Sequence, residues 1–194
     1  MSSYNQVATP ETDAVAWAPS AATLERFARE LAKYPADQKQ SAVMACLAVV
    51  QQELGYVSAA SERFVATYLG MAPIAVHEVT TFYNMYNQRP LGRYKFNVCT
   101  NLPCQLRQGQ EALEHLCSRL GVDVGGTTAD GLFTVQISEC LGACADAPVL
   151  LVNDRQMVSF MDNARLDELI ETLRFDAVNN DAQSAVAANG AAPV

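Results

Sequence analysis

Two short cysteine stretches organise this chain: Cys99-Thr-Asn-Leu-Pro-Cys104 and, after 35 intervening residues, Cys140-Leu-Gly-Ala-Cys144. Alternating apolar residues precede each stretch, over 94–98 and 133–137, and predict two strands that each lead into a cysteine loop. Loops at the carboxyl ends of strands are the usual place for a site on a sheet flanked by helices. Thiolates are soft ligands that suit Zn²⁺ or an iron–sulfur cluster, so the pattern predicts one metal centre closed from two sides.

The composition limits the classes of partner that the chain can bind. Of its 194 residues half are apolar, and 13 basic and 21 acidic side chains give a net charge of −8. An acidic surface disfavours nucleic acid and anionic membranes, whose phosphates attract basic side chains. No apolar run approaches the roughly 18 residues of a membrane span, and the first residues lack the basic start of a secretory signal. We therefore expect a cytoplasmic protein, in which thiols stay reduced and clustered cysteines indicate metal or redox chemistry.

Apolar periodicity divides the chain into two folded parts. Helical spacing recurs through the first part and predicts four helices, with Ser58 as an N-cap, Gly55 and Gly70 as C-caps, and the last helix reaching Tyr86. The predicted organisation is a disordered tail over 1–19, a four-helix domain over 20–86, a linker over 87–92, a second domain over 93–175 and a disordered tail over 176–194.

The second domain alternates strands with helices. Strands are predicted over 94–98, 133–137, 149–152 and 156–160, with a helix beginning near Leu106 and a last helix over 166–173. The order β-α-β-β-β-α is typical of a thioredoxin-like sheet with helices on its faces. The predicted fold class is therefore α+β, an N-terminal helical bundle followed by a thioredoxin-like domain.

The kind of metal centre follows from the spacing of Cys99, Cys104, Cys140 and Cys144. Structural zinc accepts these spacings, but mostly in domains too small to hold a core. Disulfides are disfavoured in a cytoplasmic chain, a thioredoxin-type catalyst needs Cys-x-x-Cys, and a [4Fe–4S] cluster usually takes three ligands from one tight run. A [2Fe–2S] cluster fits best, with zinc as the alternative. The simplest arrangement pairs Cys99 with Cys104 on one iron and Cys140 with Cys144 on the other.

Neighbouring residues are expected to shape the two loops. Pro103 places Cys104 near the start of a helix, where free backbone N–H groups favour a thiolate. Gly142 lets the second loop curl without the penalty of a Cβ. The metal is expected to be shielded from water by the apolar side chains of Leu102, Leu141 and Ala143.

Motifs around the cysteines resemble those of a known family. They are Cys99-x₄-Cys104-x₃₅-Cys140-x₃-Cys144, Thr127-Thr-Ala-Asp-Gly-Leu-Phe-Thr134, Glu139-Cys-Leu-Gly-Ala-Cys144, Ala147-Pro-Val149, Gln52-Glu-Leu-Gly-Tyr-Val57 and Glu78-Val-Thr-Thr-Phe-Tyr83. Together they resemble the small [2Fe–2S] subunit, the E chain or 24-kDa type, of bacterial NADH:quinone oxidoreductase (complex I). The resemblance spans about residues 20–175 and shows no departure at the four ligand positions.

The resemblance implies an electron-transfer subunit of an enzyme, respiratory NADH dehydrogenase. The four cysteines would hold one [2Fe–2S] cluster and exchange one electron with FMN, which is expected on an NADH-binding flavoprotein partner and not on this chain. Residues 20–86 exceed what a cluster cage needs and are expected to grip that partner. Other implied partners are the peripheral-arm subunits of the complex, at the cytoplasmic face of the inner membrane. The diaphorase subunit of an NAD-linked hydrogenase or formate dehydrogenase is an alternative, and a zinc-stapled interaction module is less favoured.

Other reactive residues are expected to have structural roles. Cys46 and Cys117 fall on apolar helix faces and are predicted to be core thiols, and His77 and His115 have no partner ligands at useful spacing. Pro148 enters a strand after the second cysteine loop, where thioredoxin-like folds often hold a cis proline, so we predict a cis Ala147–Pro148 bond. No glycine-rich phosphate loop is present, and the chain alone is not expected to react with NADH.

Overall fold

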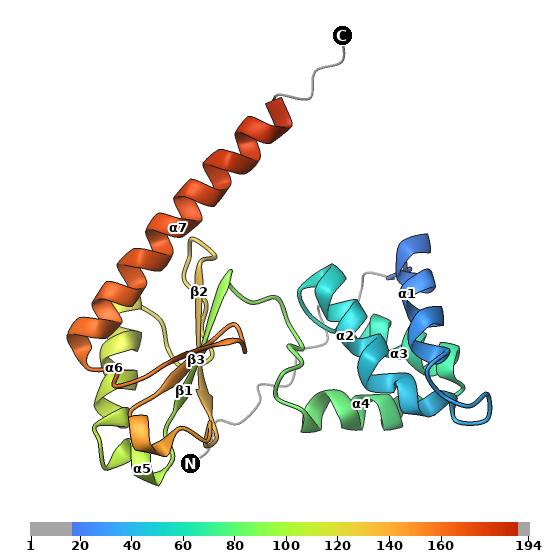
Figure 1. Ribbon diagram of the computed structural model, residues 1–194, viewed down its shortest axis with the longest axis horizontal. Coiled ribbons are helices and arrows are strands. Elements are labelled where there is room, and N and C mark those ends of the chain that lie inside the picture. The colour runs from blue at the N-terminus through green and yellow to red at the C-terminus, as the bar shows by residue number, and fades with distance from the viewer. Residues whose placement is uncertain (1–16, 190–194) are drawn as a thin grey trace. The chain divides into compact units, whose positions relative to one another are not determined.

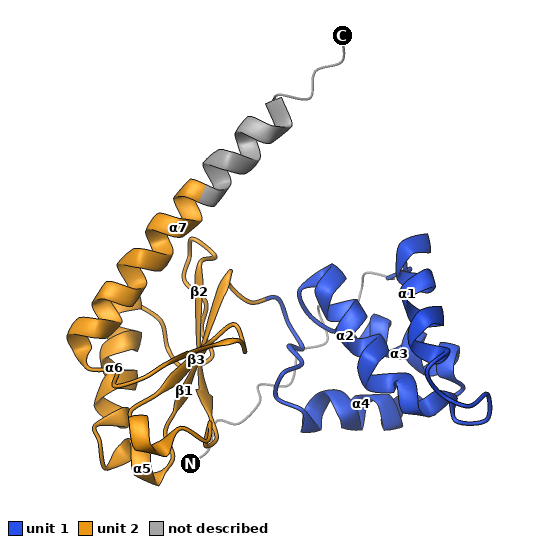
Figure 2. Cartoon of the chain, viewed as in Figure 1, with its two compact units in different colours: residues 1–90 blue, residues 91–194 orange. Residues whose placement is uncertain are grey.

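The computed structural model describes residues 17–189 and shows an α+β fold, as the sequence predicts. The chain divides between Pro90 and Leu91 into two compact units, residues 1–90 and 91–194 (Figure 2). Of the tails expected to be disordered, 1–19 and 176–194, residues 1–16 and 190–194 lie outside the described residues.

Unit 1 is helical, with elements α1 (Ala21–Leu31), η2 (Lys39–Ala42), α2 (Val43–Leu54), α3 (Ala59–Leu69) and α4 (Pro73–Phe82) (Figure 1). The predicted caps are in place: the Ser58 side chain accepts a hydrogen bond from the Ser61 N–H at 3.1 Å, and Gly55 and Gly70 end α2 and α3 in left-handed conformations. The core of this unit includes Phe27, Leu47, Val50, Val65 and Val76, all fully buried.

A buried carboxylate links α3 to α4. Glu62 is 7% exposed, and its two oxygens pair with the Thr80 hydroxyl and with Nδ1 of His77, the latter at 3.0 Å. The fourth helix is shorter than predicted, because Tyr83 already has an extended backbone and Tyr86 turns away to donate its hydroxyl to the Met44 carbonyl at 2.9 Å. Phe82 is left 79% exposed at the end of α4.

Unit 2 is built on a four-stranded sheet. Its elements are β1 (Tyr94–Cys99), α5 (Leu102–Gln105), α6 (Gly109–Leu120), β2 (Phe133–Ser138), η3 (Cys144–Asp146), β3 (Leu150–Val152), β4 (Gln156–Val158) and α7 (Asn163–Asn189). The strand order is β2-β1-β3-β4, with β1 and β2 parallel and the other pairs antiparallel. The parallel register places Tyr94 beside Phe133 and Cys99 beside Ser138. Both strands therefore end at the same edge of the sheet.

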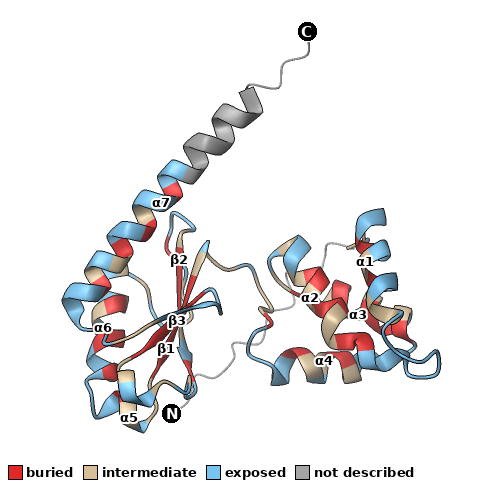
Figure 3. Ribbon diagram, viewed as in Figure 1, coloured by how far each residue is buried: buried red, intermediate tan, exposed pale blue. Residues whose placement is uncertain are grey.

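The core of unit 2 lies between the sheet and two helices. Helices α6 and α7 cover the same face (Figure 1), and buried residues concentrate between them and the strands (Figure 3). Phe96 stacks on Phe133 with ring centroids 5.4 Å apart and contributes to this core. The alternate residues of β1 are polar: Lys95 pairs with Asp154 at 2.5 Å, and the Asn97 amide donates to the same carboxylate at 2.6 Å. This alternation leads from Lys95 through Asn97 to Cys99 on one side of the strand.

The helices of unit 2 differ from the prediction at two places. The helix expected from Leu106 is split into α5 and α6, because Gln108 adopts a left-handed conformation between them. Helix α7 also continues to Asn189, into the segment from Asp176 that the sequence analysis expects to be disordered. Alanines recur through 176–189 and have the highest helix propensity, which the low apolar content of this segment concealed.

Candidate metal centre

The parallel pairing of β1 and β2 brings the two cysteine loops together. Cys99 is the last residue of β1 and lies in register with Ser138, the last residue of β2, so Cys140 follows two residues beyond the same edge. The predicted loops thus leave neighbouring strands side by side. Cys99 and Cys104 also lie in one cluster of buried residues with Ala147 and Val149.

The first cysteine loop is anchored by a backbone hydrogen bond and by close packing. Cys99 and Cys104 are 2% and 1% exposed, and the Cys99 N–H donates to the Val149 carbonyl at 3.1 Å. Cys104 lies in the short helix α5, with Pro103 in its first turn as predicted. Gly109 packs on this turn: a Cβ at Gly109 would lie 2.7 Å from the Cys104 carbonyl oxygen. Only glycine allows that approach without displacing the Cys104 backbone.

The second loop presents its cysteines at the surface. Cys140 and Cys144 are exposed, and their sulfurs lie 3.5 Å apart. Gly142 has a φ of 79°, the left-handed curl that the sequence predicts. The short helix η3 then carries Cys144 into the chain that returns to β3. One pair of cysteines is therefore exposed and the other is buried.

A small apolar wall stands between the pairs and the interior. Leu141 and Ala143 pack against the buried residues Ala147 and Val149, as expected for shielding residues. Leu102 does not, because its side chain points outward from α5 and is 67% exposed. The Ala147–Pro148 peptide bond is cis, which confirms the prediction.

The thiols influence one another electrostatically. Burial raises the pKa of the Cys104 thiol to about 11, against a backbone hydrogen bond at Val149 that favours the thiolate, and Cys99 and Cys144 raise it further. The pKa of Cys144 is raised chiefly by its hydrogen bond with Cys140. A thiol must lose its proton to bind a metal, so metal binding here releases protons.

The donor set fits a [2Fe–2S] cluster. Around a tetrahedral metal with metal–sulfur bonds of about 2.3 Å, two bound sulfurs lie about 3.8 Å apart, close to the 3.5 Å between Cys140 and Cys144. Cys99 and Cys104 form the second hydrogen-bonded pair. Within the described part of the chain, no group of three or more His, Cys, Asp or Glu side chains is placed to hold a single metal ion. Four thiolates in two pairs suit a [2Fe–2S] cluster, with one pair on each iron.

Two residues that support the cysteine loops are not predicted from the sequence. Gly109 was not singled out, because close approach between two backbones leaves no trace in a spacing pattern. Glu139, which directly precedes Cys140, accepts a hydrogen bond from the Asn101 amide at 2.8 Å. Its position in the second cysteine motif was the available signal.

The other cysteines and both histidines lie outside this site. Cys46 is fully buried in unit 1, where burial raises its pKa to about 12, and Cys117 packs half-buried against the core of unit 2. His77 pairs with Glu62 as described, and His115 Nε2 lies 3.0 Å from Asp167, linking α6 to α7. These residues have the packing roles that the sequence predicts.

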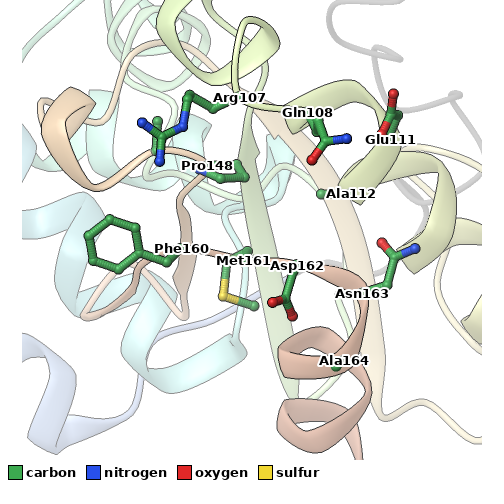
Figure 4. Close-up of a pocket in the computed structure, with 11 residues that line it drawn as sticks. Arg107, Gln108, Glu111, Ala112, Pro148, Phe160, Met161, Asp162, Asn163 and Ala164 are labelled. Carbon is green, nitrogen blue, oxygen red and sulfur yellow. The ribbon is translucent and has the colours of Figure 1, made fainter.

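A pocket of about 490 Å³ is lined by Pro148 and by residues of the segments before α6 and α7 (Figure 4). It opens between the start of α6, near Arg107, and the start of α7, near Asp162, with Phe160 at its rim. None of the four site cysteines lines it. The pocket is therefore separate from the metal centre, although the two share Ala147.

Comparison with known proteins identifies the family. The family model described as thioredoxin-like [2Fe–2S] ferredoxin matches residues 27–174. NADH-quinone oxidoreductase subunit 2 of Thermus thermophilus is 41% identical over 143 residues, which cover 74% of this chain and 79% of that protein. A subunit of NADH-quinone oxidoreductase from Rhizobium meliloti is 37% identical over 166 residues, covering 86% of this chain and 97% of that protein.

A solved structure has a related fold. The air-oxidized NAD⁺-reducing [NiFe]-hydrogenase matches with a TM-score of 0.57 and 26% identity, over 67% of this chain and 23% of that one. Within the described residues of the present chain, no helix is long and apolar enough to cross a membrane. The match to the family model covers both cysteine loops and most of the helical unit. The chain belongs to the family of thioredoxin-like [2Fe–2S] ferredoxins, and its named relatives are subunits of NADH-quinone oxidoreductase.

Proposed function

We propose that this chain is the electron-transfer subunit of a respiratory NADH:quinone oxidoreductase. Cys99, Cys104, Cys140 and Cys144 hold one [2Fe–2S] cluster, which exchanges one electron with FMN on a partner flavoprotein. The observation that carries the proposal is the meeting of a buried and an exposed thiol pair at the shared edge of β1 and β2. The relatives named as subunits of this enzyme support the choice of complex.

The roles of the residues follow from their placement. A bound [2Fe–2S] cluster supplies reversible one-electron chemistry, which needs no acid or base from the protein. The buried pair anchors the centre to the sheet, because Cys99 is fixed to Val149 by a backbone hydrogen bond. The exposed pair brings the other side of the centre to the surface, where a partner can approach closely. Ala147 and Val149 keep the inner side dry.

The helical unit supplies a surface for the partner. Ile74, Phe82 and Met85 are 63%, 79% and 42% exposed on α4 and the turn that follows it. Exposed apolar side chains gathered on one segment indicate a protein interaction site. We therefore assign residues 20–86 mainly to binding the flavoprotein, and 93–175 to holding the cluster. Peripheral attachment at the cytoplasmic face of the membrane, through other subunits of the complex, belongs to the same proposal.

A second candidate is the corresponding subunit of an NAD-linked hydrogenase. The likeness to the NAD⁺-reducing hydrogenase favours it, although this chain spans only 23% of that one. Both candidates use the same four cysteines and differ in the partners with which the cluster exchanges electrons. Reconstitution with the flavoprotein and then with quinone-reducing or hydrogen-oxidising partners separates the two.

The test of this function is anaerobic reduction of the full-length chain. NADH donates a hydride, so a flavin must stand between it and a one-electron centre. We expect dithionite, but not NADH, to bleach the visible spectrum of the chain alone. Addition of the FMN-bearing partner should make the centre NADH-reducible, provided that its potential allows the flavin to donate. Rapid reduction of the lone, flavin-free chain by NADH would contradict the proposal.

A further inference from the structure

A side-chain hydrogen bond joins the two cysteine loops. The Asn101 amide nitrogen donates to Oε2 of Glu139 at 2.8 Å. Asn101 lies between Cys99 and Cys104, and Glu139 directly precedes Cys140. The bond therefore connects the segment that carries the buried thiol pair to the segment that carries the exposed pair.

The bond sits where the backbone ladder ends. The parallel register of β1 and β2 stops at Cys99 and Ser138, and Asn101 and Glu139 lie two residues and one residue beyond that pair. The first loop is anchored independently, through the Cys99 N–H to Val149 and through the packing of Gly109. The second loop is held at its return, where the Asp146 N–H donates to the Ala143 carbonyl at 3.0 Å and the Asp146 carbonyl accepts from the Phe160 N–H at 2.8 Å.

We propose that Asn101 and Glu139 form a latch that holds the exposed thiol pair at the separation from the buried pair that a [2Fe–2S] cluster requires. The proposal rests on the proposed function, because it needs a cluster to hold. Both are positioning residues and act through the cysteines beside them. When the latch is closed, the loop with Cys140 and Cys144 shields the centre. When it opens, this loop moves outward and exposes the irons to solvent and to chelators.

Loss of the cluster to a chelator measures this opening. A hydrogen bond to a charged group contributes enough that its loss changes an opening equilibrium about tenfold. The bleaching rate of the visible band in excess chelator should therefore rise about tenfold in Asn101→Ala and in Glu139→Ala. Because Glu139→Ala already removes the bond that Asn101→Ala breaks, the double alanine variant should bleach no faster than Glu139→Ala alone.

Exchange of donor and acceptor separates the bond from the charge of Glu139. Asn101→Asp alone sets two carboxylates against each other and should bleach faster than Asn101→Ala. Glu139→Gln alone keeps an acceptor for Asn101 and should stay near wild type. The double variant Asn101→Asp/Glu139→Gln restores the bond in reverse, from the glutamine amide to the aspartate, and should return to within about threefold of wild type. It keeps the net charge of the wild-type pair.

A matched control comes from α6. Gln110 donates its amide to Glu114 at 3.0 Å, another exposed amide–carboxylate bond, which forms within α6 and does not join the two cysteine loops. Gln110→Ala should leave the bleaching rate unchanged. The electron paramagnetic resonance spectrum of the reduced centre should broaden in Asn101→Ala and sharpen again in the exchanged pair, which a merely structural effect on unfolding would not produce.

Each outcome decides the proposal. Multiplicative effects of the two alanine substitutions, or an exchanged pair that bleaches as fast as Asn101→Asp, would overturn the latch while leaving the cluster assignment intact. A wild-type chain that holds no [2Fe–2S] cluster would instead remove the proposed function itself. Coupled alanine variants, rescue by exchange and an unaffected Gln110→Ala would support the latch.

Discussion

The backbone of Gly109 lies directly against that of Cys104. A Cβ at Gly109 would come within 2.7 Å of the Cys104 carbonyl oxygen and 2.8 Å of its carbonyl carbon. The first residue of α6 therefore sets how deeply the turn that carries Cys104 can sit. The position of one cysteine depends on the absence of a side chain five residues later.

Gly109→Ala should consequently reduce cluster occupancy. The added methyl group forces the Cys104 turn outward, at a cost of about 1–3 kcal/mol in the free energy of unfolding. Iron and sulfide per chain should fall together with the unfolding temperature. Gly121→Ala, at the other end of α6, is the control: Gly121 has a φ of 67° and free space around it, so that variant should lose stability but keep full iron content. Equal occupancy in both variants would count against this role of Gly109.

Partner binding should depend on Phe82. This ring is 79% exposed at the end of α4, and its substitution by alanine should cost more than about 1 kcal/mol of binding free energy if α4 faces the flavoprotein. Titration calorimetry with the partner measures the loss. Phe175→Ala provides a control, because Phe175 is 68% exposed on α7 just beyond the segment matched by the family model. No loss of binding free energy in Phe82→Ala, or a loss no larger than that in Phe175→Ala, would contradict the assignment of α4 to flavoprotein binding.

Acid should remove a contribution of Asp130 to stability. Its pKa is lowered, first by the hydrogen bond from Thr128, then by the Leu132 N–H and Arg174, so folding favours its charged form. The contribution is present at neutral pH and is lost as the pH falls below the ordinary aspartate range, through the lowered pKa. Asp130→Asn should lower stability at pH 7 by no more than about 1 kcal/mol, the usual range for an exposed ion pair. Unfolding midpoints of the two proteins should converge as the pH falls below the ordinary aspartate range, and a constant gap would refute this.

The buried Glu62 should stabilise the helical unit and not the metal centre. Glu62→Ala removes the buried carboxylate that pairs with the Thr80 hydroxyl and with the His77 ring, and should cost about 1–3 kcal/mol. Circular dichroism should show earlier loss of helix, while the visible spectrum at low temperature stays that of wild type. Thr80→Val removes only one of the two bonds and should cost less. A bleached spectrum in folded Glu62→Ala would reveal an unexpected coupling between the two units.

The strands and most helices could be predicted because local chemistry decides them. Alternating apolar residues predict the two strands that lead into the cysteine loops. Asn153 and Asp154 form the expected turn between β3 and β4, and glycines mark the ends of α2 and α3. Prediction was wrong where a boundary depends on one residue's conformation. Gln108, with a φ of 68°, ends the helical run after α5, and glutamine is not a residue type that predicts a left-handed conformation.

The site could be predicted only as a set of residues. The spacing of the motifs identifies the four cysteines, but it does not show which pair is buried. That depends on Val149, just before β3, which accepts a hydrogen bond from the Cys99 N–H. The hydrogen bond between Asn101 and Glu139 depends on the register of β1 and β2. The end of β1 at Cys99 and the start of β2 at Phe133 are 34 residues apart in the sequence. Contacts of this kind arise from topology, which periodicity does not encode.

The most direct test of the account is the iron, sulfide and zinc content of the purified full-length chain, measured with its visible spectrum. We predict two irons and two acid-labile sulfides per chain, negligible zinc, and a visible band that is lost or distorted in Cys99→Ser, Cys104→Ser, Cys140→Ser and Cys144→Ser, because serine is a harder ligand. Cys46→Ser and Cys117→Ser should keep the wild-type band. One zinc per chain without sulfide, or an unchanged band in Cys140→Ser, would contradict the assignment of these four cysteines to a [2Fe–2S] cluster.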